Sequence, residues 1–142
     1  MKLEGTLAVM ISFQIGDTAS VTKTILETDI VAFADISGDK NPLHLDAEFA
    51  ARSRFGQRIA HGALVSSLIS NVIGNQLPGQ GSIYLSSSLK FRAPTFIDDT
   101  ITATATISSI RQDKPIFVLE CVCKNQHGEV VCQGESVVLY ES

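Results

Sequence analysis

The chain has few of the features that mark secreted, membrane-embedded or nucleic-acid-binding proteins. It contains three cysteines in 142 residues, an odd number that does not suit a framework of paired disulfides. No apolar run approaches the roughly 18 residues that a membrane-spanning helix needs. Acidic residues outnumber lysine and arginine by 15 to 11, and the net charge of −4 disfavours nucleic acid or an anionic membrane surface as a partner. These absences predict a cytoplasmic protein.

Linkers, internal repeats and low-complexity segments are lacking as well. The hydrophobic content of 44% and charged content of 18% are typical of a compact globular fold. The N-terminal run Leu7–Ile11 is short and has neither the basic region nor the cleavage pattern of a signal peptide. The chain is therefore interpreted as a single domain, residues 1–142, with residues 1–12 as a candidate N-terminal extension.

Hydrophobic spacing predicts helices in the first half of the chain. A strand across Ser20–Leu26 should lead into a short helix that Thr28 or Asp29 caps and Gly38 ends. The segment Gly62–Ile73 carries apolar residues at helical spacing with small residues between them, which predicts a helix buried on most sides. Gly74 and Asn75 are suitable residues to end that second helix.

The second half of the chain alternates apolar and polar residues and predicts four strands. They cover Ile83–Phe91, Ile101–Ile107, Pro115–Lys124 and Glu129–Tyr140. The last two should form a hairpin, and a turn centred on Gln126 and His127 would place Cys121 opposite Cys132 and leave His127 in solvent. We interpret the cysteines as buried thiols rather than metal ligands. A buried helix followed by antiparallel strands predicts an α+β fold in which the sheet wraps the helix.

Asp39 and His44 stand five residues apart in the segment Ser37–Asp46, within a long connection that has at most a turn of helix near Ala47–Arg52. Gly38 frees the backbone and Pro42 fixes its own φ, so the segment is expected to be a rigid, non-helical loop. A carboxylate and an imidazole held together can share acid–base work on one substrate. The alternative is a turn in which Asp39 and Asn41 bond nearby backbone and His44 is structural.

The residues Phe33-Ala34-x-x-Ser37-Gly38-Asp39-x-Asn41-Pro42-Leu43-His44-x-Asp46 resemble the motif of the (R)-specific enoyl-CoA hydratases, in the MaoC-like dehydratase family. The resemblance extends to His61-Gly62, to Leu77–Leu85 and to Asp113-Lys114-Pro115, which are similar to segments of the short bacterial hydratases that supply polyhydroxyalkanoate synthesis. It covers about residues 13–140. The resemblance implies the hot-dog fold, an antiparallel sheet wrapped around a long buried helix.

The resemblance also implies an activity, the reversible syn addition of water to a trans-2-enoyl-CoA to give an (R)-3-hydroxyacyl-CoA. Asp39 and His44 would be the catalytic acid–base pair. The backbone N–H of Gly62, at the start of the buried helix, would stabilise the enolate oxygen by about 3–4 kcal/mol. Asn41 and Ser70 are the expected substrate-binding residues. No metal or separate cofactor is implied, because coenzyme A is part of the substrate.

Other functions stay open on the sequence. They are a 3-hydroxyacyl-thioester dehydratase acting on acyl carrier protein, a hot-dog thioesterase, and a non-catalytic subunit that binds acyl thioesters. A homodimer is expected in each case, because a single open sheet leaves an edge strand with unpaired backbone groups. His61 is interpreted as an anchor of the helix start and Asp46 as a cap or turn residue. Cations for the coenzyme A phosphates are left unassigned among Arg58, Lys90, Arg92, Arg111 and Lys114.

Overall fold

A computed structural model of the protein describes residues 12–141. The candidate N-terminal extension therefore lies, apart from residue 12, outside the described residues. The helices are α2 (Glu27–Ser37), α3 (Pro42–Leu45), α4 (Ala47–Ala51) and α5 (Gly62–Asn75). The strands are β1 (Thr18–Thr24), β2 (Ser82–Phe91), β3 (Thr100–Ile110), β4 (Ile116–Lys124) and β5 (Val130–Tyr140). None of these helices is long and apolar enough to cross a membrane.

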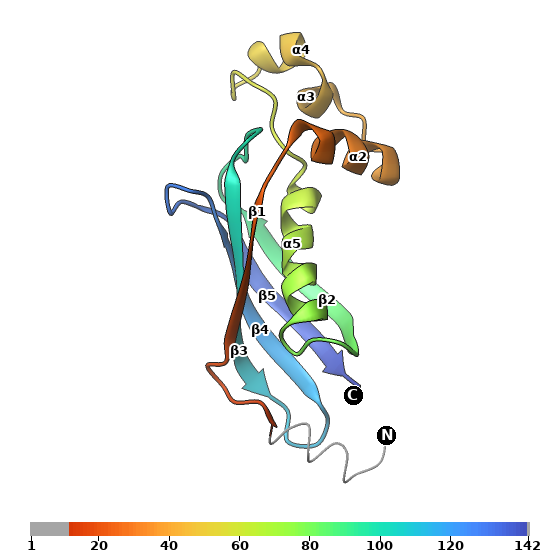
Figure 1. Cartoon of the computed structure of the whole chain (residues 1–142), viewed down its shortest axis with the longest axis vertical. Coiled ribbons are helices and arrows are strands. Elements are labelled where there is room, and N and C mark those ends of the chain that lie inside the picture. Colours follow the sequence, from red (N-terminus) through yellow and green to blue (C-terminus); the bar gives the residue numbers. More distant parts are fainter. Residues whose placement is uncertain (1–11, 142) are drawn as a thin grey trace.

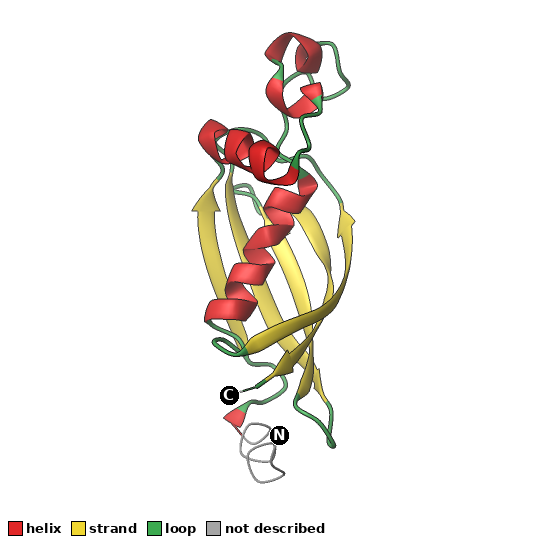
Figure 2. Ribbon diagram, turned by 90° about the vertical axis from the view of Figure 1, so that its right-hand side faces the viewer, coloured by secondary structure: helices red, strands yellow, loops and turns green. Residues whose placement is uncertain are grey.

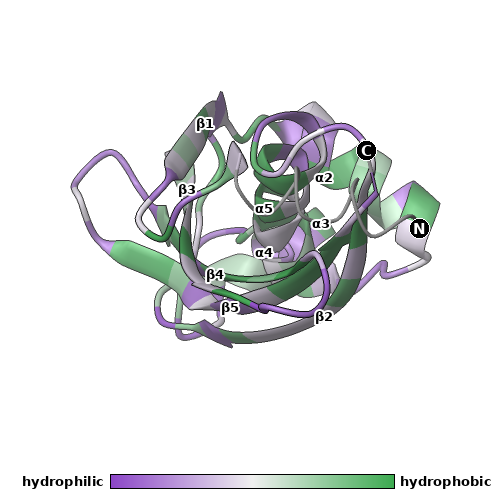
Figure 3. Ribbon diagram, turned by 90° about the horizontal axis from the view of Figure 1, so that it is seen from below, coloured by the Kyte–Doolittle hydropathy of each residue, from purple (hydrophilic) through white to green (hydrophobic). Residues whose placement is uncertain are grey.

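The five strands form one antiparallel sheet in the order β1-β3-β4-β5-β2. The sheet curves around α5, which lies along its inner face (Figures 1 and 2). A view along the long axis places α5 inside the curve of the strands (Figure 3). The short helices α2, α3 and α4 lie beyond one end of the sheet, next to the start of α5. This arrangement confirms the predicted α+β hot-dog fold.

The core lies between α5 and the concave face of the sheet. Alternate residues of β3 and β4 are buried, as the period of two in a half-buried strand requires. The helix contributes one apolar face, with five buried residues: Val65, Leu68, Ile69, Val72 and Ile73. Its opposite face is small and polar, and Ser67, Ser70 and Asn71 are exposed. The helix is thus covered by the sheet on one side only, so the prediction of a helix buried on most sides is wrong for the single chain.

The two edges of the sheet differ in chemistry. On the outer face of β1, four hydroxyl side chains bond directly across to β3, in the pairs Thr18–Thr106, Ser20–Thr104, Thr22–Thr102 and Thr24–Thr100, at 2.9–3.0 Å. The β2 edge instead exposes large apolar side chains, including Ile83, Leu85 and Phe91. One edge is therefore polar and internally satisfied, whereas the other is apolar and open.

Some predicted helix boundaries are wrong. The first helix begins at Glu27, with Leu26 as the N-cap residue instead of Thr28 or Asp29. The carboxylate of Asp29, the third helical residue, accepts a hydrogen bond from the Leu26 N–H at 2.8 Å and so stabilises the start of the helix. Gly38 does end this helix, with φ of 79° in the left-handed region. The long helix continues through Gly74 and Asn75, the two residues predicted to stop it.

The predicted pairing of Cys121 with Cys132 is also wrong. Cys132 lies opposite Cys123, and Cys121 lies opposite Gly134. The turn pairs Lys124 with Val130, which is one residue off the predicted register, and an irregularity between Cys123 and Lys124 adds a second residue. All three cysteines are free and buried. The hydrogen bond with Cys132, together with burial, raises the pKa of the Cys123 thiol, and burial raises the pKa of the Cys121 thiol. His127, in contrast, is exposed in the hairpin turn as predicted.

Candidate active site

The connection between α2 and α5 contains more helix than the sequence predicts. Pro42–Leu45 forms one helical turn, so the expectation of a wholly non-helical loop is wrong for this part. Pro42 occupies the first helical position, where its missing N–H costs nothing. The Asn41 side chain caps the turn by accepting a hydrogen bond from the Leu43 N–H at 3.0 Å. Asp46 then caps α4, which confirms its predicted role as a cap.

Asp39 is held by local hydrogen bonds just after α2. Its N–H donates to Ser37 Oγ at 3.1 Å, and its Oδ1 accepts from the Asn41 N–H at 3.2 Å. The side chain is exposed in the described part of the chain. A carboxylate in this position is fixed at its backbone and remains accessible to a ligand.

His44 is buried, with 8% of its surface exposed, and its ring is oriented by a main-chain contact. Nδ1 lies 2.7 Å from the carbonyl oxygen of Ile59. Because a carbonyl oxygen only accepts, this contact assigns the proton to Nδ1 and leaves the Nε2 lone pair for a substrate or water. Arg58 supports the same turn by donating from Nε to the His44 carbonyl at 2.7 Å, and it pairs with Glu27 at 2.7 Å.

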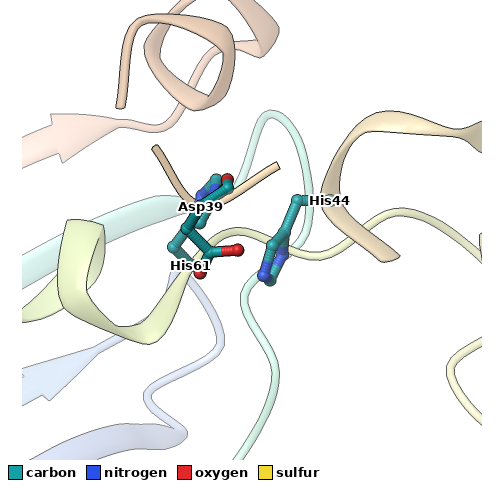
Figure 4. Close-up of side chains that lie close together, drawn as sticks. All are labelled: Asp39, His44 and His61. Atoms are coloured by element: carbon teal, nitrogen blue, oxygen red, sulfur yellow. The ribbon is translucent and has the colours of Figure 1, made fainter. Parts of the chain in front are cut away.

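The structure brings Asp39, His44 and His61 together in one cluster (Figure 4). Potential ligand atoms of the three side chains all lie within 4.8 Å of one another. The rings of His44 and His61 stack, with centroids 3.9 Å apart and planes inclined by 28°. Stacked imidazoles point their in-plane lone pairs alongside each other, not toward one point, so the geometry suits proton transfer better than metal ligation.

Gly62 starts α5 directly beside this cluster. Its N–H has no acceptor among residues 12–141, as is normal for the first residue of a helix. The free N–H and the helix dipole favour a developing negative charge at this point. A Cβ on Gly62 would lie 2.9 Å from the Phe91 ring, so any larger residue here requires the Phe91 side chain to shift.

A cavity of about 610 Å³ adjoins the cluster on the side of Gly62. Its walls are mostly apolar, and two arginines line it, Arg54 and Arg92. Neither Asp39 nor His44 lines this cavity, so it lies next to the pair without containing it. Of the cations considered in the sequence, Arg58 and Arg111 are already paired with Glu27 and Asp113, whereas Arg92 lines the cavity.

The two expected substrate-binding residues lie apart from each other. Asn41 is adjacent to Asp39, and its side-chain oxygen is engaged in capping α3. Ser70 is exposed on the uncovered face of α5, eight residues beyond Gly62, or about 12 Å along the helix axis. The contact between the rings of His61 and His44 could not be predicted from the sequence, because it joins the turn α3 to the start of α5. The one feature of the sequence that pointed to His61 was its position next to Gly62.

Comparison with known proteins agrees with this fold. Residues 13–122 match the MaoC like domain. The (R)-specific enoyl-CoA hydratase of Aeromonas caviae is 44% identical over 127 residues, covering 89% of this chain and 95% of the relative. A mitochondrial 3-hydroxyacyl-[acyl-carrier-protein] dehydratase of Arabidopsis thaliana is 36% identical over 129 residues, covering 89% and 76%.

Solved structures support the same assignment. The (R)-hydratase from A. caviae involved in PHA biosynthesis has a TM-score of 0.89 at 43% identity, covering 92% of this chain and 98% of that structure. The unliganded R-hydratase PhaJ1 from Pseudomonas aeruginosa has a TM-score of 0.88 at 36% identity, covering 94% and 85%. The chain belongs to the MaoC-like family. Within that family, its similarity extends over nearly the full length of the A. caviae (R)-specific enoyl-CoA hydratase.

Proposed function

We propose that the protein is an (R)-specific enoyl-CoA hydratase, a hydro-lyase that adds water reversibly to trans-2-enoyl-CoA. The observation that carries the proposal is the convergence of Asp39 and His44 beside the free N–H of Gly62. Relatives 44% identical to the chain are hydratases of this name, from A. caviae and Rhodospirillum rubrum. The cluster and the relatives thus support the same activity.

The chemistry needs two proton-transfer groups and one stabiliser of negative charge. Water must lose a proton as its oxygen attacks C3 of the enoyl group, and C2 must gain one to complete the addition. Asp39 and His44 divide these two transfers through the water held between them. The electron pair displaced from the double bond builds negative charge on the thioester oxygen, and the Gly62 N–H donates a hydrogen bond to that oxygen.

The substrate is an acyl thioester, and coenzyme A enters as part of it, with no other cofactor. The cavity beside Gly62 offers apolar walls for the thioester arm and two arginines for anionic groups. Asn41 acts on substrate binding indirectly, because its side chain fixes the loop that carries Asp39. Ser70 would contact the substrate from the exposed face of α5. A second candidate is dehydration of a 3-hydroxyacyl group on acyl carrier protein, because the A. thaliana relative bears that name.

We predict that the purified protein hydrates crotonyl-CoA and that the product is the (R)-3-hydroxy thioester. Loss of the enoyl absorbance measures hydration, and a thiol reagent measures release of coenzyme A. An (R)-specific and an (S)-specific dehydrogenase then distinguish the product enantiomers. Release of free thiol would indicate a thioesterase, and oxidation by the (S)-specific enzyme would contradict the stereochemistry. A strong preference for crotonyl on acyl carrier protein would favour the second candidate.

We also infer that the active enzyme is a homodimer joined through the β2 edge. The strand is an unpaired edge of the sheet within residues 12–141, and Ile83, Leu85 and Phe91 are each at least 44% exposed along it. Soluble proteins normally cover such an edge. Two copies that pair β2 with β2 would extend the sheet and would cover the small polar face of α5.

A cytoplasmic location fits the three free cysteines.

For the dimer we expect Leu85→Glu to give a monomer at micromolar concentration with depressed activity. Leu85 is 49% exposed in the single chain, so a carboxylate there is tolerated by the fold but would meet its own copy across the twofold axis. Ile15→Glu is the matched control, because Ile15 is 68% exposed near the opposite edge. Sedimentation or light scattering measures the assembly. A fully active wild-type monomer would defeat the inference.

A further inference from the structure

His61 is a buried polar residue with contacts to both members of the proposed catalytic pair. It is 2% exposed and precedes Gly62 at the start of α5. Its Nε2 lies 3.0 Å from the main-chain oxygen of Asp39, which assigns the proton to Nε2. One face of its ring stacks on His44 with centroids 3.9 Å apart, and Phe33 packs against the ring at 4.8 Å with a tilt of 56°.

We propose that His61 is a positioning residue that sets the distance between Asp39 and His44. This role rests on the proposed hydratase function and goes beyond it. The hydrogen bond fixes the backbone from which the Asp39 carboxylate projects, whereas the local bonds of Asp39 involve only its neighbours Ser37 and Asn41. The Ile59 carbonyl holds one edge of the His44 ring, and the stacked His61 ring restrains its face. Reacting groups that must share one water depend on such restraint.

The second ring nitrogen of His61 argues against a purely structural role. Nδ1 is buried and has no hydrogen-bond partner in the described part of the chain. A buried polar atom without a partner destabilises a fold, and each such atom calls for an explanation. A phenylalanine would fill the same space against Phe33 and His44 without this cost. The imidazole therefore supplies what phenylalanine lacks, the N–H that reaches Asp39.

The test separates stability from turnover in one substitution. His61→Phe keeps an aromatic face for His44, removes the unpaired nitrogen and removes the donor to Asp39. Asp39 is an exposed residue and its contact with His61 is only partly buried, so the loss of this hydrogen bond should destabilise the fold little. We expect the melting temperature to be unchanged or higher, kcat for crotonyl-CoA to fall about 10- to 100-fold, and KM to change little. His61→Gln retains an N–H donor and should recover part of the loss. His127→Phe, at the exposed histidine of the hairpin, should behave as wild type.

A double-mutant cycle with Asp39→Asn tests whether His61 acts through Asp39. If it does, His61→Phe adds little to the loss already caused by Asp39→Asn, and the two effects are not additive. Additive losses would overturn the proposal. So would wild-type kcat in His61→Phe, or a fall of kcat that merely follows a fall of the melting temperature.

One measurement needs no substitution. Nitrogen-15 spectra of the histidines in the wild-type protein report which ring nitrogen carries each proton, and His61 should be the Nε2–H form while His44 is the Nδ1–H form. An Nδ1–H form at His61 would overturn the proposal even if a variant fails to fold. A wild-type protein that does not hydrate crotonyl-CoA would defeat the proposed function itself, whereas an active wild type with unaffected His61 variants defeats only the positioning role.

Discussion

Asp39→Asn and His44→Gln should each lower kcat for crotonyl-CoA hydration by about 10²- to 10⁴-fold, because each removes one of the two proposed proton-transfer groups. The fold should survive both changes. Asp39 is exposed, and its Oδ1 contact with the Asn41 N–H can be made by an asparagine oxygen. Glutamine at position 44 is similar to histidine in size and polarity, and its amide nitrogen matches the position of Nε2, whereas His44→Asn would place an amide nitrogen at the position of Nδ1, the atom that meets the Ile59 carbonyl. The measurement is steady-state hydration, with circular dichroism to verify the fold.

Matched controls exist elsewhere in the chain. Asp98→Asn changes an exposed carboxylate whose φ of 71° suits asparagine, and His127→Gln changes the exposed histidine of the hairpin. Both controls should retain wild-type turnover. Near-normal hydration by folded Asp39→Asn or His44→Gln would remove that residue from the mechanism.

Gly62→Pro should reduce kcat by about 10²- to 10³-fold relative to Gly62→Ala, because proline removes the N–H that we propose donates to the thioester oxygen. The backbone accepts proline at this place. Gly62 is the first helical residue, and His61 before it has φ −59° and ψ 135°, the conformation that precedes proline. Both variants place a Cβ about 2.9 Å from the Phe91 ring, so this contact cancels in their comparison, which retains the loss of the N–H and the added ring carbons of proline.

A loss of activity in these variants could also come from a clash with Phe91 instead of from the missing N–H. If Phe91 cannot move aside, Gly62→Ala and Gly62→Pro lose activity and melting temperature together. Phe91→Leu in the same background then relieves the contact, since Phe91 is 55% exposed at the end of β2. Equal turnover of the alanine and proline variants would assign the oxyanion contact to a group other than the Gly62 N–H.

The parts of the fold that depend on side-chain periodicity could be predicted from the sequence. The strands of the second half and the buried helix follow from periods of two and 3.6, because the core selects the same side of an element at each repeat. The hairpin register could not, since the turn pairs Lys124 with Val130 and an irregularity then shifts the pairings from Cys123 onward by a further residue. The continuation of α5 past Gly74 is similar: glycine lowers helix propensity, but the packing of Ile73 outweighs it.

The candidate site was predictable only in part for a related reason. Asp39 and His44 are close in the chain, and the motif that contains both of them indicates that they act as a pair. The contacts of His61 and Ile59 with that pair join segments about 15 to 22 residues apart. Such contacts depend on the start of α5 packing beneath the α2–α3 connection, which local patterns do not encode. The position of Phe91 of β2 against Gly62 could not be predicted for the same reason.

The unlike edges of the sheet limit how far the protein can assemble. The β2 edge has 10 residues and apolar side chains to offer an incoming strand, whereas β1 has 7 residues and outward hydroxyls that are already bonded to β3. Lys23, paired with Asp29, adds a charge at the β1 edge. A strand arriving there would bury little apolar surface. If two copies pair through β2 as proposed, growth of the sheet would end after that one addition, and the protein should remain free of fibrils even when it is highly concentrated.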